Sequence, residues 1–170
     1  MGDVRRDLYL PDTYKIFRPI VEAGGGRIMT WGLSSVQNMW PLIEAINQQE
    51  MVGLELVVGY SRDTHNLGEL VNNSRGWIER CDCPVKVFWS RNVHAKVWDL
   101  HDGTTWVGSA NLVRNTLSNV MVRVRRNRTI EELRRTVLTE GVELRPGTDL
   151  ALLTTRRQYD NINGTHISLE

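Results

Sequence analysis

The chain has 170 residues, of which 41% are hydrophobic, and its formal net charge is +1. This length and composition are typical of one folded domain with its own core, and the low net charge gives no overall indication of nucleic-acid binding. The chain has no long uncharged apolar run, and its first twelve residues carry charges throughout. We therefore expect no membrane association and a cytoplasmic location.

The N-terminal half alternates predicted helices with predicted strands. Asp12 is a candidate N-cap for the first helix, and the glycines from Gly24 onward end it. The apolar run 53–60 is typical of a strand in a sheet covered on both faces. The expected helices are 12–23, 35–49 and 67–80, and the expected strands are 27–31, 53–60 and 85–89. This order favours an α/β domain.

The second half begins with a predicted hairpin. Strands are expected over 93–100 and 104–107, joined by a tight turn at Asp102-Gly103. A further strand is expected over 119–124, followed by a helix over 129–140 that opens with a capping box from Thr129 to Glu132. The pattern decays after Pro146. We therefore expect one domain over residues 1–158 and a frayed tail over 159–170.

Four polar residues with complementary chemistry surround this hairpin. His94 and Lys96 are two residues apart on a predicted strand, so their side chains share one face of the sheet. The returning strand is followed by Ser109 and Asn111, which the hairpin brings back alongside. One edge of the sheet is thus expected to gather an imidazole, an ammonium, a hydroxyl and a carboxamide.

These groups suit a phosphoryl centre. A neutral His94 can attack phosphorus, and Lys96 can neutralise the non-bridging oxygens. Ser109 and Asn111 can donate hydrogen bonds to the same oxygens. No carboxylate cluster stands nearby for a pair of metal ions, so we expect metal-independent chemistry without a cofactor.

The pattern His-x-Lys followed by Gly-Ser-x-Asn after a short hairpin resembles the signature of the phospholipase D superfamily. The resemblance covers roughly residues 93–124. It implies a mixed sheet sandwiched between helices and a phosphodiesterase with a phosphohistidine intermediate. It also implies a homodimer, because the superfamily's mechanism uses a second histidine as the general acid and this chain has one such motif. Single-motif members of this size resemble dimeric nucleases.

Two positions depart from the superfamily pattern. An aspartate is common five positions after the lysine, where this chain has His101, and Asp102 follows one residue later. Asp102 is thus a candidate site carboxylate, although it is more simply explained as a turn residue. Met121 stands where nuclease-like members often have a glutamate. The alternative function is therefore a catalytically weakened module that binds nucleic acid or a protein. A lipid phosphodiesterase is a third, less favoured hypothesis.

Basic residues follow the site motif. Arg123 and Arg125 share a face of the predicted strand and lead away from His94, and Arg114 lies three residues past Asn111. These three arginines are candidate nucleic-acid contacts, with DNA favoured over RNA, although arginines at such positions can equally be solvated surface residues. Trp31 ends a predicted strand, which is where α/β sheets commonly bind ligands.

Overall fold

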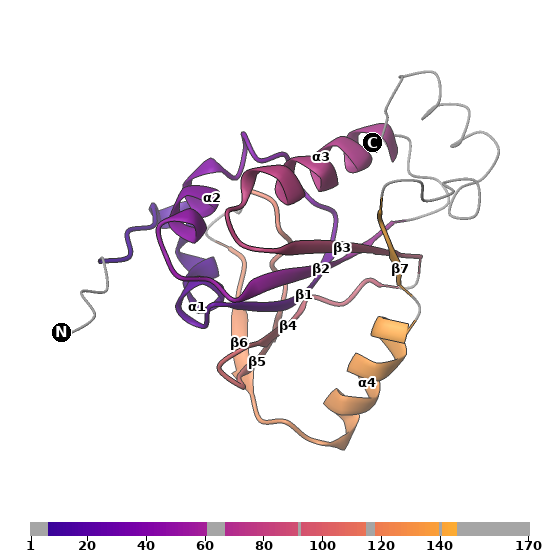
Figure 1. Ribbon diagram of the computed structural model, residues 1–170. Helices are drawn as coiled ribbons and strands as arrows, with labels where there is room; N and C mark the ends of the chain where they lie inside the picture. The colour runs from indigo at the N-terminus through magenta and orange to yellow at the C-terminus, as the bar shows by residue number, and fades with distance from the viewer. Residues whose placement is uncertain (1–6, 61–66, 92, 115–117, 140, 146–170) are drawn as a thin grey trace.

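The computed structural model describes residues 7–60, 67–91, 93–114, 118–139 and 141–145 (Figure 1). Seven strands form one sheet in the order β6-β5-β4-β1-β2-β3-β7. The strands are β1 (Gly25–Trp31), β2 (Gly53–Gly59), β3 (Val85–Ser90), β4 (Val97–Leu100), β5 (Thr105–Gly108), β6 (Met121–Val124) and β7 (Val142–Glu143). The helices are η1 (Asp12–Phe17, a 3₁₀ helix), α1 (Arg18–Glu22), α2 (Trp40–Asn47), α3 (Leu67–Arg80) and α4 (Arg128–Thr139).

The sheet is mixed. Its centre is parallel, because β1 pairs with β2 and β2 with β3, with α2 and α3 as the crossover helices. The remaining pairs are antiparallel: β4 with β1, β5 with β4, β6 with β5 and β7 with β3. The β4–β5 hairpin is thereby joined to the parallel centre through β1.

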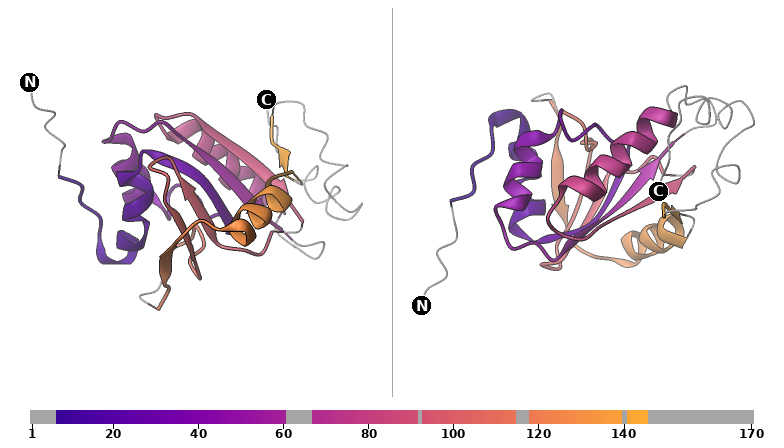
Figure 2. Two further views of the ribbon diagram at one scale, coloured as in Figure 1. Left: turned by 90° about the horizontal axis from the view of Figure 1, so that it is seen from below. Right: turned by 45° about the horizontal axis from the view of Figure 1, so that its top comes forward.

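The two faces of the sheet are covered differently. On the main-core side, Ile28 and Trp98 are neighbours across β1 and β4 and pack beneath η1, α1, α2 and α3. On the other side, here called the α4 side, Met29 and Val97 belong to a much smaller apolar cluster. Figures 1 and 2 show α2 and α3 on one side of the sheet and α4 on the other. The expected α/β class, with a mixed sheet sandwiched by helices, is confirmed.

Most of the expected elements are present, but several bounds differ. Helix α3 spans the predicted residues 67–80. The single helix expected over 12–23 is instead η1 followed by α1, and Asp12 makes no N-cap hydrogen bond. The helix expected over 35–49 begins only at Trp40, because Pro41 is tolerated in a first turn but not in a helix interior. Trp40, at the first position of this helix, is exposed.

Two local motifs form differently from the prediction. The hairpin turn has three residues, 101–103, because the Gly103 amide donates to the Leu100 carbonyl and the Leu100 amide donates to Thr104. Gly103 adopts a φ of 84°, which completes this turn type. Helix α4 is capped by Asn127, whose side chain accepts a hydrogen bond from the Ile130 amide at 3.0 Å, so the capping box expected at Thr129 is wrong.

The predicted tail over 159–170 and the end of the predicted domain, 146–158, lie outside the described residues. In the part of the chain that is described, no helix has the length and apolar character needed to span a membrane.

Candidate functional site

The segment that carries His94 is not a strand. Strand β4 begins at Val97, so the prediction of a strand from residue 93 is wrong for its first four residues. The segment crosses from β3 over the end of β2, and this crossing depends on Gly59. A Cβ on Gly59 would lie 2.0 Å from the Val93 carbonyl oxygen. The absence of a side chain at Gly59 therefore lets the His94 segment lie directly on the sheet.

His94 is exposed, and its ring stacks on Trp31 at the end of β1. The ring centroids are 4.6 Å apart and the planes are inclined by 35°. On either side of His94, Val93 and Ala95 pack into the apolar cluster of the α4 side. The imidazole is thus held by an aromatic neighbour and by buried flanking residues while it stays open to solvent.

Lys96 lies against the backbone of the same segment. Its Nζ donates to the His94 carbonyl oxygen at 2.9 Å, which places the ammonium beside His94. The Lys96 carbonyl accepts from the Gly108 amide at 3.2 Å. This bond extends the β4–β5 ladder by one pair and brings the end of β5 next to Lys96.

Asn111 connects the end of β5 to the end of β1. Its Oδ1 accepts the backbone amide of Trp31 at 2.9 Å. The neighbouring Leu112 amide donates to the hydroxyl of Thr30, which is fully buried. Asn111 therefore fixes the backbone of the residue on which His94 stacks.

Ser109 is held in the connection between β5 and β6. Its Oγ donates to Asn119 Oδ1 at 3.2 Å and accepts from the Val120 amide at 3.0 Å. Gly108 makes this approach possible, because a Cβ there would lie 2.0 Å from the Val120 carbonyl oxygen. The space beside Gly108 is therefore filled by the chain itself.

His94, Lys96, Ser109 and Asn111 thus lie at one end of the β4–β5 hairpin, which we call the site end. The opposite end, with the turn 101–103, is called the tip end. Trp31, at the site end, also borders a cleft of about 180 Å³ whose lining includes Tyr60, Glu69 and Asn73.

Asp102 is not near His94. It lies at the tip end, where its Oδ1 accepts from the amide and the hydroxyl of Thr104 at 2.9 and 2.6 Å. About six residues of extended chain separate it from Lys96, or roughly 20 Å. His101 is also at the tip end, where its Nε2 lies 3.2 Å from the Gly53 carbonyl oxygen. The turn interpretation of Asp102 fits the structure, and the structure does not bring its carboxylate to the site.

Met121 and Arg114 lie nearer to the site end. Met121 is paired with Gly108 and packs against the main core. Arg114 is exposed and follows Leu112, which forms a bridge with Leu33. Met121 therefore has a packing role at the position where the superfamily pattern has an acid.

Arg123 and Arg125 lead from the site end to the tip end. Arg123 pairs with Trp106 across β5 and β6, and Trp106 pairs with Trp98. Its side chain therefore belongs to the main-core side, whereas Val93 and Ala95, on either side of His94, pack on the α4 side.

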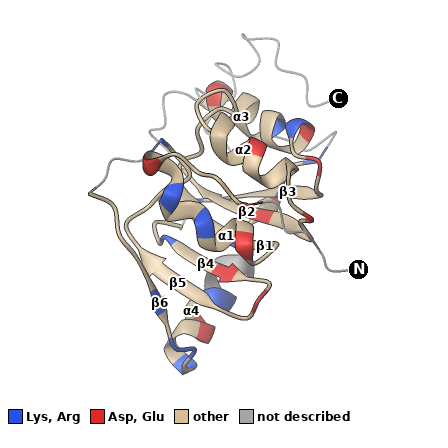
Figure 3. Cartoon of the chain, turned by 90° about the vertical axis from the view of Figure 1, so that its left-hand side faces the viewer, with Lys and Arg blue, Asp and Glu red and all other residues tan. Residues whose placement is uncertain are grey.

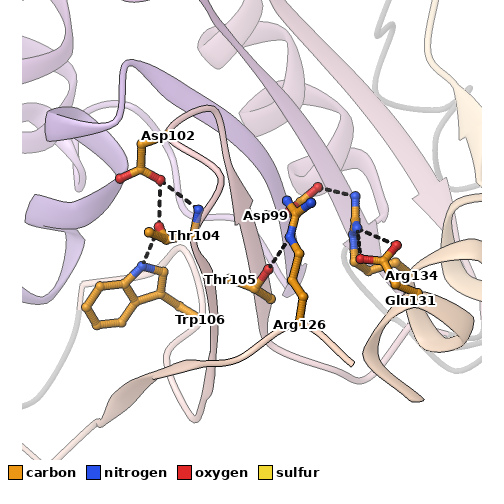
Figure 4. A network of polar contacts seen from close by, with 8 residues as sticks. All are labelled: Asp99, Asp102, Thr104, Thr105, Trp106, Arg126, Glu131 and Arg134. Carbon is orange, nitrogen blue, oxygen red and sulfur yellow. Dashed lines mark hydrogen bonds and ion pairs between the residues drawn. The ribbon is translucent and has the colours of Figure 1, made fainter. Parts of the chain in front are cut away.

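An ionic network joins α4 to the sheet near the tip end (Figure 4). Asp99 binds Arg126 at 2.6 Å and also binds Arg134 of α4, which in turn contacts Glu131 at 2.7 Å. The side chains of Asp99 and Arg134 are only 13% and 15% exposed. The sequence did not predict this network. Asp99 is an alternating position of a predicted strand and Arg134 belongs to a basic cluster, and the two are too far apart in the chain for a local pattern to pair them.

Two further features bear on the chemistry of the chain. Among the described residues, no group of three or more His, Cys, Asp or Glu side chains is arranged to hold a metal ion. Burial raises the pKa of the Cys81 thiol to about 12, and burial also raises the pKa of Cys83. Both cysteines are therefore protonated at neutral pH, as expected of ordinary structural thiols.

Sequence reasoning missed the residues that support the site. In the sequence, Thr30 and Gly59 belong to predicted apolar strands and have no evident connection to the site. In the structure, Thr30 binds the segment 111–112 at the end of β1, and Gly59 contacts the segment 93–96 at the end of β2. Two features of the sequence could have indicated these supporting residues: the hydroxyl of Thr30 within an apolar strand, and Gly59 at the end of an apolar run.

Comparisons with known proteins give one structural likeness to report. The structure is similar to Nuc from Salmonella typhimurium, a phospholipase D family member, with a TM-score of 0.49 and 14% sequence identity, covering 75% of this chain and 90% of that one. No protein-family model matches the sequence. No curated protein matches it either.

Proposed function

We propose that the chain is a metal-independent phosphodiesterase, a nuclease that acts through a phosphohistidine at His94. The observation that carries this proposal is the gathering of His94, Lys96, Ser109 and Asn111 at the site end, with the imidazole exposed and stacked on Trp31. An exposed imidazole beside an ammonium is suited to attack on an anionic diester.

The chemistry would proceed in two steps. A ring nitrogen of His94 forms a bond to phosphorus while the bond to the leaving oxygen breaks, and a general acid protonates that oxygen. Water then attacks phosphorus and gives a proton to the general acid, which now acts as a base; the bond from phosphorus to the His94 nitrogen breaks, which releases the phosphomonoester and restores the imidazole. Lys96 and Asn111 are suited to stabilise the charge that develops on the non-bridging oxygens, and Ser109 would join them when its hydroxyl exchanges its bond to Asn119 for one to the substrate.

The general acid is proposed to be His94 of a second copy of this chain in a two-fold homodimer. Light scattering at micromolar concentration should give twice the chain mass. A strict monomer that retains activity would contradict the two-histidine mechanism.

We also expect activity to persist in EDTA. If chelation abolished activity and magnesium or zinc restored it, metal independence would be contradicted.

His94→Ala tests the proposal most directly. Cleavage of DNA, RNA and bis-(p-nitrophenyl) phosphate should fall by about a thousandfold or more, because no other neutral nucleophile replaces the ring. His101→Ala, which removes an exposed histidine at the tip end, is the matched control. Trapping an acid-labile phosphate on the wild-type chain, and not on the variant, would identify the intermediate. Equal cleavage by His94→Ala would refute the site.

A second candidate function is a binding module on the same fold. The observation that favours it is Met121, which packs against the main core where an acid is common in nuclease-like members. Wild-type protein that binds nucleic acid, forms dimers and cleaves no diester would support this candidate over the first.

A further inference from the structure

The tip end carries a groove that the proposed chemistry at His94 does not use. Its volume is about 580 Å³, and it is lined by Gly103, Thr104 and the segment from Arg123 to Arg126. Figure 3 shows lysines and arginines in blue along β6 and the adjoining start of α4. Three of the lining residues are arginines, so the groove has the chemistry of an anion site.

Two of these arginines have their charge available. Arg123 and Arg125 are exposed, and within the described ranges neither has a carboxylate within ion-pairing distance. Arg126 is held differently, because Asp99 binds its Nη2 and Thr105 Oγ1 accepts from its Nε at 3.3 Å. The groove therefore combines two unneutralised guanidiniums with one that is fixed in place.

Neither Asp99 nor Asp102 forms an ion pair with Arg123 or Arg125 among the described contacts. Asp99 is shared between Arg126 and Arg134. Asp102 Oδ1 is occupied by the amide and hydroxyl of Thr104, whose hydroxyl also accepts from the Trp106 indole at 3.1 Å. These bonds shape the wall of the groove beside Thr104 and leave Arg123 and Arg125 facing solvent.

The spacing suits a repeating anion. Arg123 and Arg125 are two residues apart on extended chain, or about 7 Å, comparable with the separation of neighbouring phosphates along a nucleic-acid strand. In the described part of the chain β6 is an edge strand, so side chains from either sheet face reach the same rim. A polymer that follows this rim from the site end would reach Arg125 after about 15 Å.

We infer that this groove binds the phosphate backbone of a polynucleotide about two phosphates from the bond at His94, and that it makes the chain favour long substrates over short ones. The preference for long substrates rests on the proposed function. The binding itself does not, because it depends on Arg123 and Arg125 alone.

Binding is tested in the His94→Ala background, which removes cleavage from the measurement. Fluorescence anisotropy would compare a labelled 20-nucleotide single strand and a labelled dinucleotide. Arg123→Ala and Arg125→Ala should each weaken binding of the 20-mer by about tenfold, lower its salt slope by about one, and change dinucleotide binding much less. Arg80→Ala, an exposed arginine at the end of α3, is the matched control and should bind the 20-mer like the parent.

Three results would overturn the inference. One is unchanged binding of the 20-mer by both variants, and another is an equal loss in Arg80→Ala. The third is displacement of the 20-mer by polyglutamate as readily as by unlabelled DNA, which would make the groove a general polyanion surface. Circular dichroism melts confirm that each variant is folded.

The two proposals fail independently. If the wild type cleaves nothing but the arginine variants lose 20-mer binding, the groove stands and the nuclease proposal falls. If the wild type cleaves bis-(p-nitrophenyl) phosphate but the arginine variants bind the 20-mer normally, the nuclease proposal stands and the groove falls.

Discussion

The two ends of the β4–β5 hairpin are held in place by different forces. At the site end, backbone lies directly on backbone at Gly59 and Gly108, and amides are shared with Asn111 and Ser109. At the tip end, Asp99 binds one arginine beside the sheet and one on α4 (Figure 4). Steric fit and neutral hydrogen bonds respond little to salt, whereas salt weakens the ion pair between Asp99 and the half-exposed Arg126, and weakens the mostly buried Asp99–Arg134 pair less. The comparison implies a site that keeps its geometry across conditions and a tip end that loosens as ionic strength rises.

The site end is most sensitive to volume, so Gly59→Ala should have the largest effect. The added Cβ would overlap the Val93 carbonyl oxygen and the Trp31 ring, and the His94 segment would have to move away from the sheet. We expect a loss of about 3 kcal/mol in the free energy of unfolding, measured by urea denaturation, and, on the proposed function, loss of diester cleavage. Gly76→Ala is the control, because a Cβ in α3 would make only ordinary contacts at 3.5 Å with Val36. Equal stability of the two variants would contradict the steric account.

The tip end is most sensitive to charge, which Asp99→Asn tests. The substitution removes one of the two anionic partners of the mostly buried Arg134 and leaves Glu131 as the other, and we expect a loss of about 2 kcal/mol. The loss should shrink in 1 M salt, because Arg126 is half-exposed. Glu55→Gln is the control, since its pair with Arg27 is 36% exposed on both sides and contributes little. A salt-independent loss would show that the network acts through packing instead.

Trp31→Leu separates positioning of His94 from folding. Loss of the ring stack should cost about 1 kcal/mol of stability and, on the proposed mechanism, lower kcat by about tenfold with little change in KM. The proton resonances of the His94 ring should also shift when the indole ring current is removed. Trp40→Leu, which removes an exposed tryptophan of α2, is the control. An unchanged His94 spectrum would mean that the stack does not hold the ring in solution.

The smallest effect is expected at Asp102. Asp102→Ala removes the acceptor for the Thr104 amide and hydroxyl and should cost about 0.5 to 1 kcal/mol. Asp102→Asn keeps an acceptor oxygen and should cost less. Thermal melts would resolve the difference. A large loss of diester hydrolysis in Asp102→Ala, at unchanged stability, would mean that the carboxylate reaches the site after all.

Much of the fold follows from local pattern. Helix α3 matches its predicted bounds because its apolar spacing is regular and a polar turn follows it. The predicted strands in the first half match β1, β2 and β3 to within two residues at each end. The errors lie where two local signals competed: Pro41 moved the start of α2, and Asn127 rather than Thr129 capped α4.

The four candidate site residues could be named from the sequence because residue type and spacing are local properties. A short hairpin necessarily returns Ser109 beside Lys96, whatever the rest of the fold does. The sequence by itself therefore determined the α/β class and the gathering of these side chains at one end of the hairpin.

Only the tertiary structure decided what supports those side chains and where the arginines lie. His94 rests on Trp31 because β1, 63 residues earlier, ends beneath it, and Gly59 admits the crossing. Asp99 and Arg134 meet because α4 folds back over the sheet, and Asp102 is kept from the site by the length of β4. The physical reason is the same in each case: close packing and ion pairs depend on which surfaces meet in three dimensions, and no local pattern in the sequence encodes that.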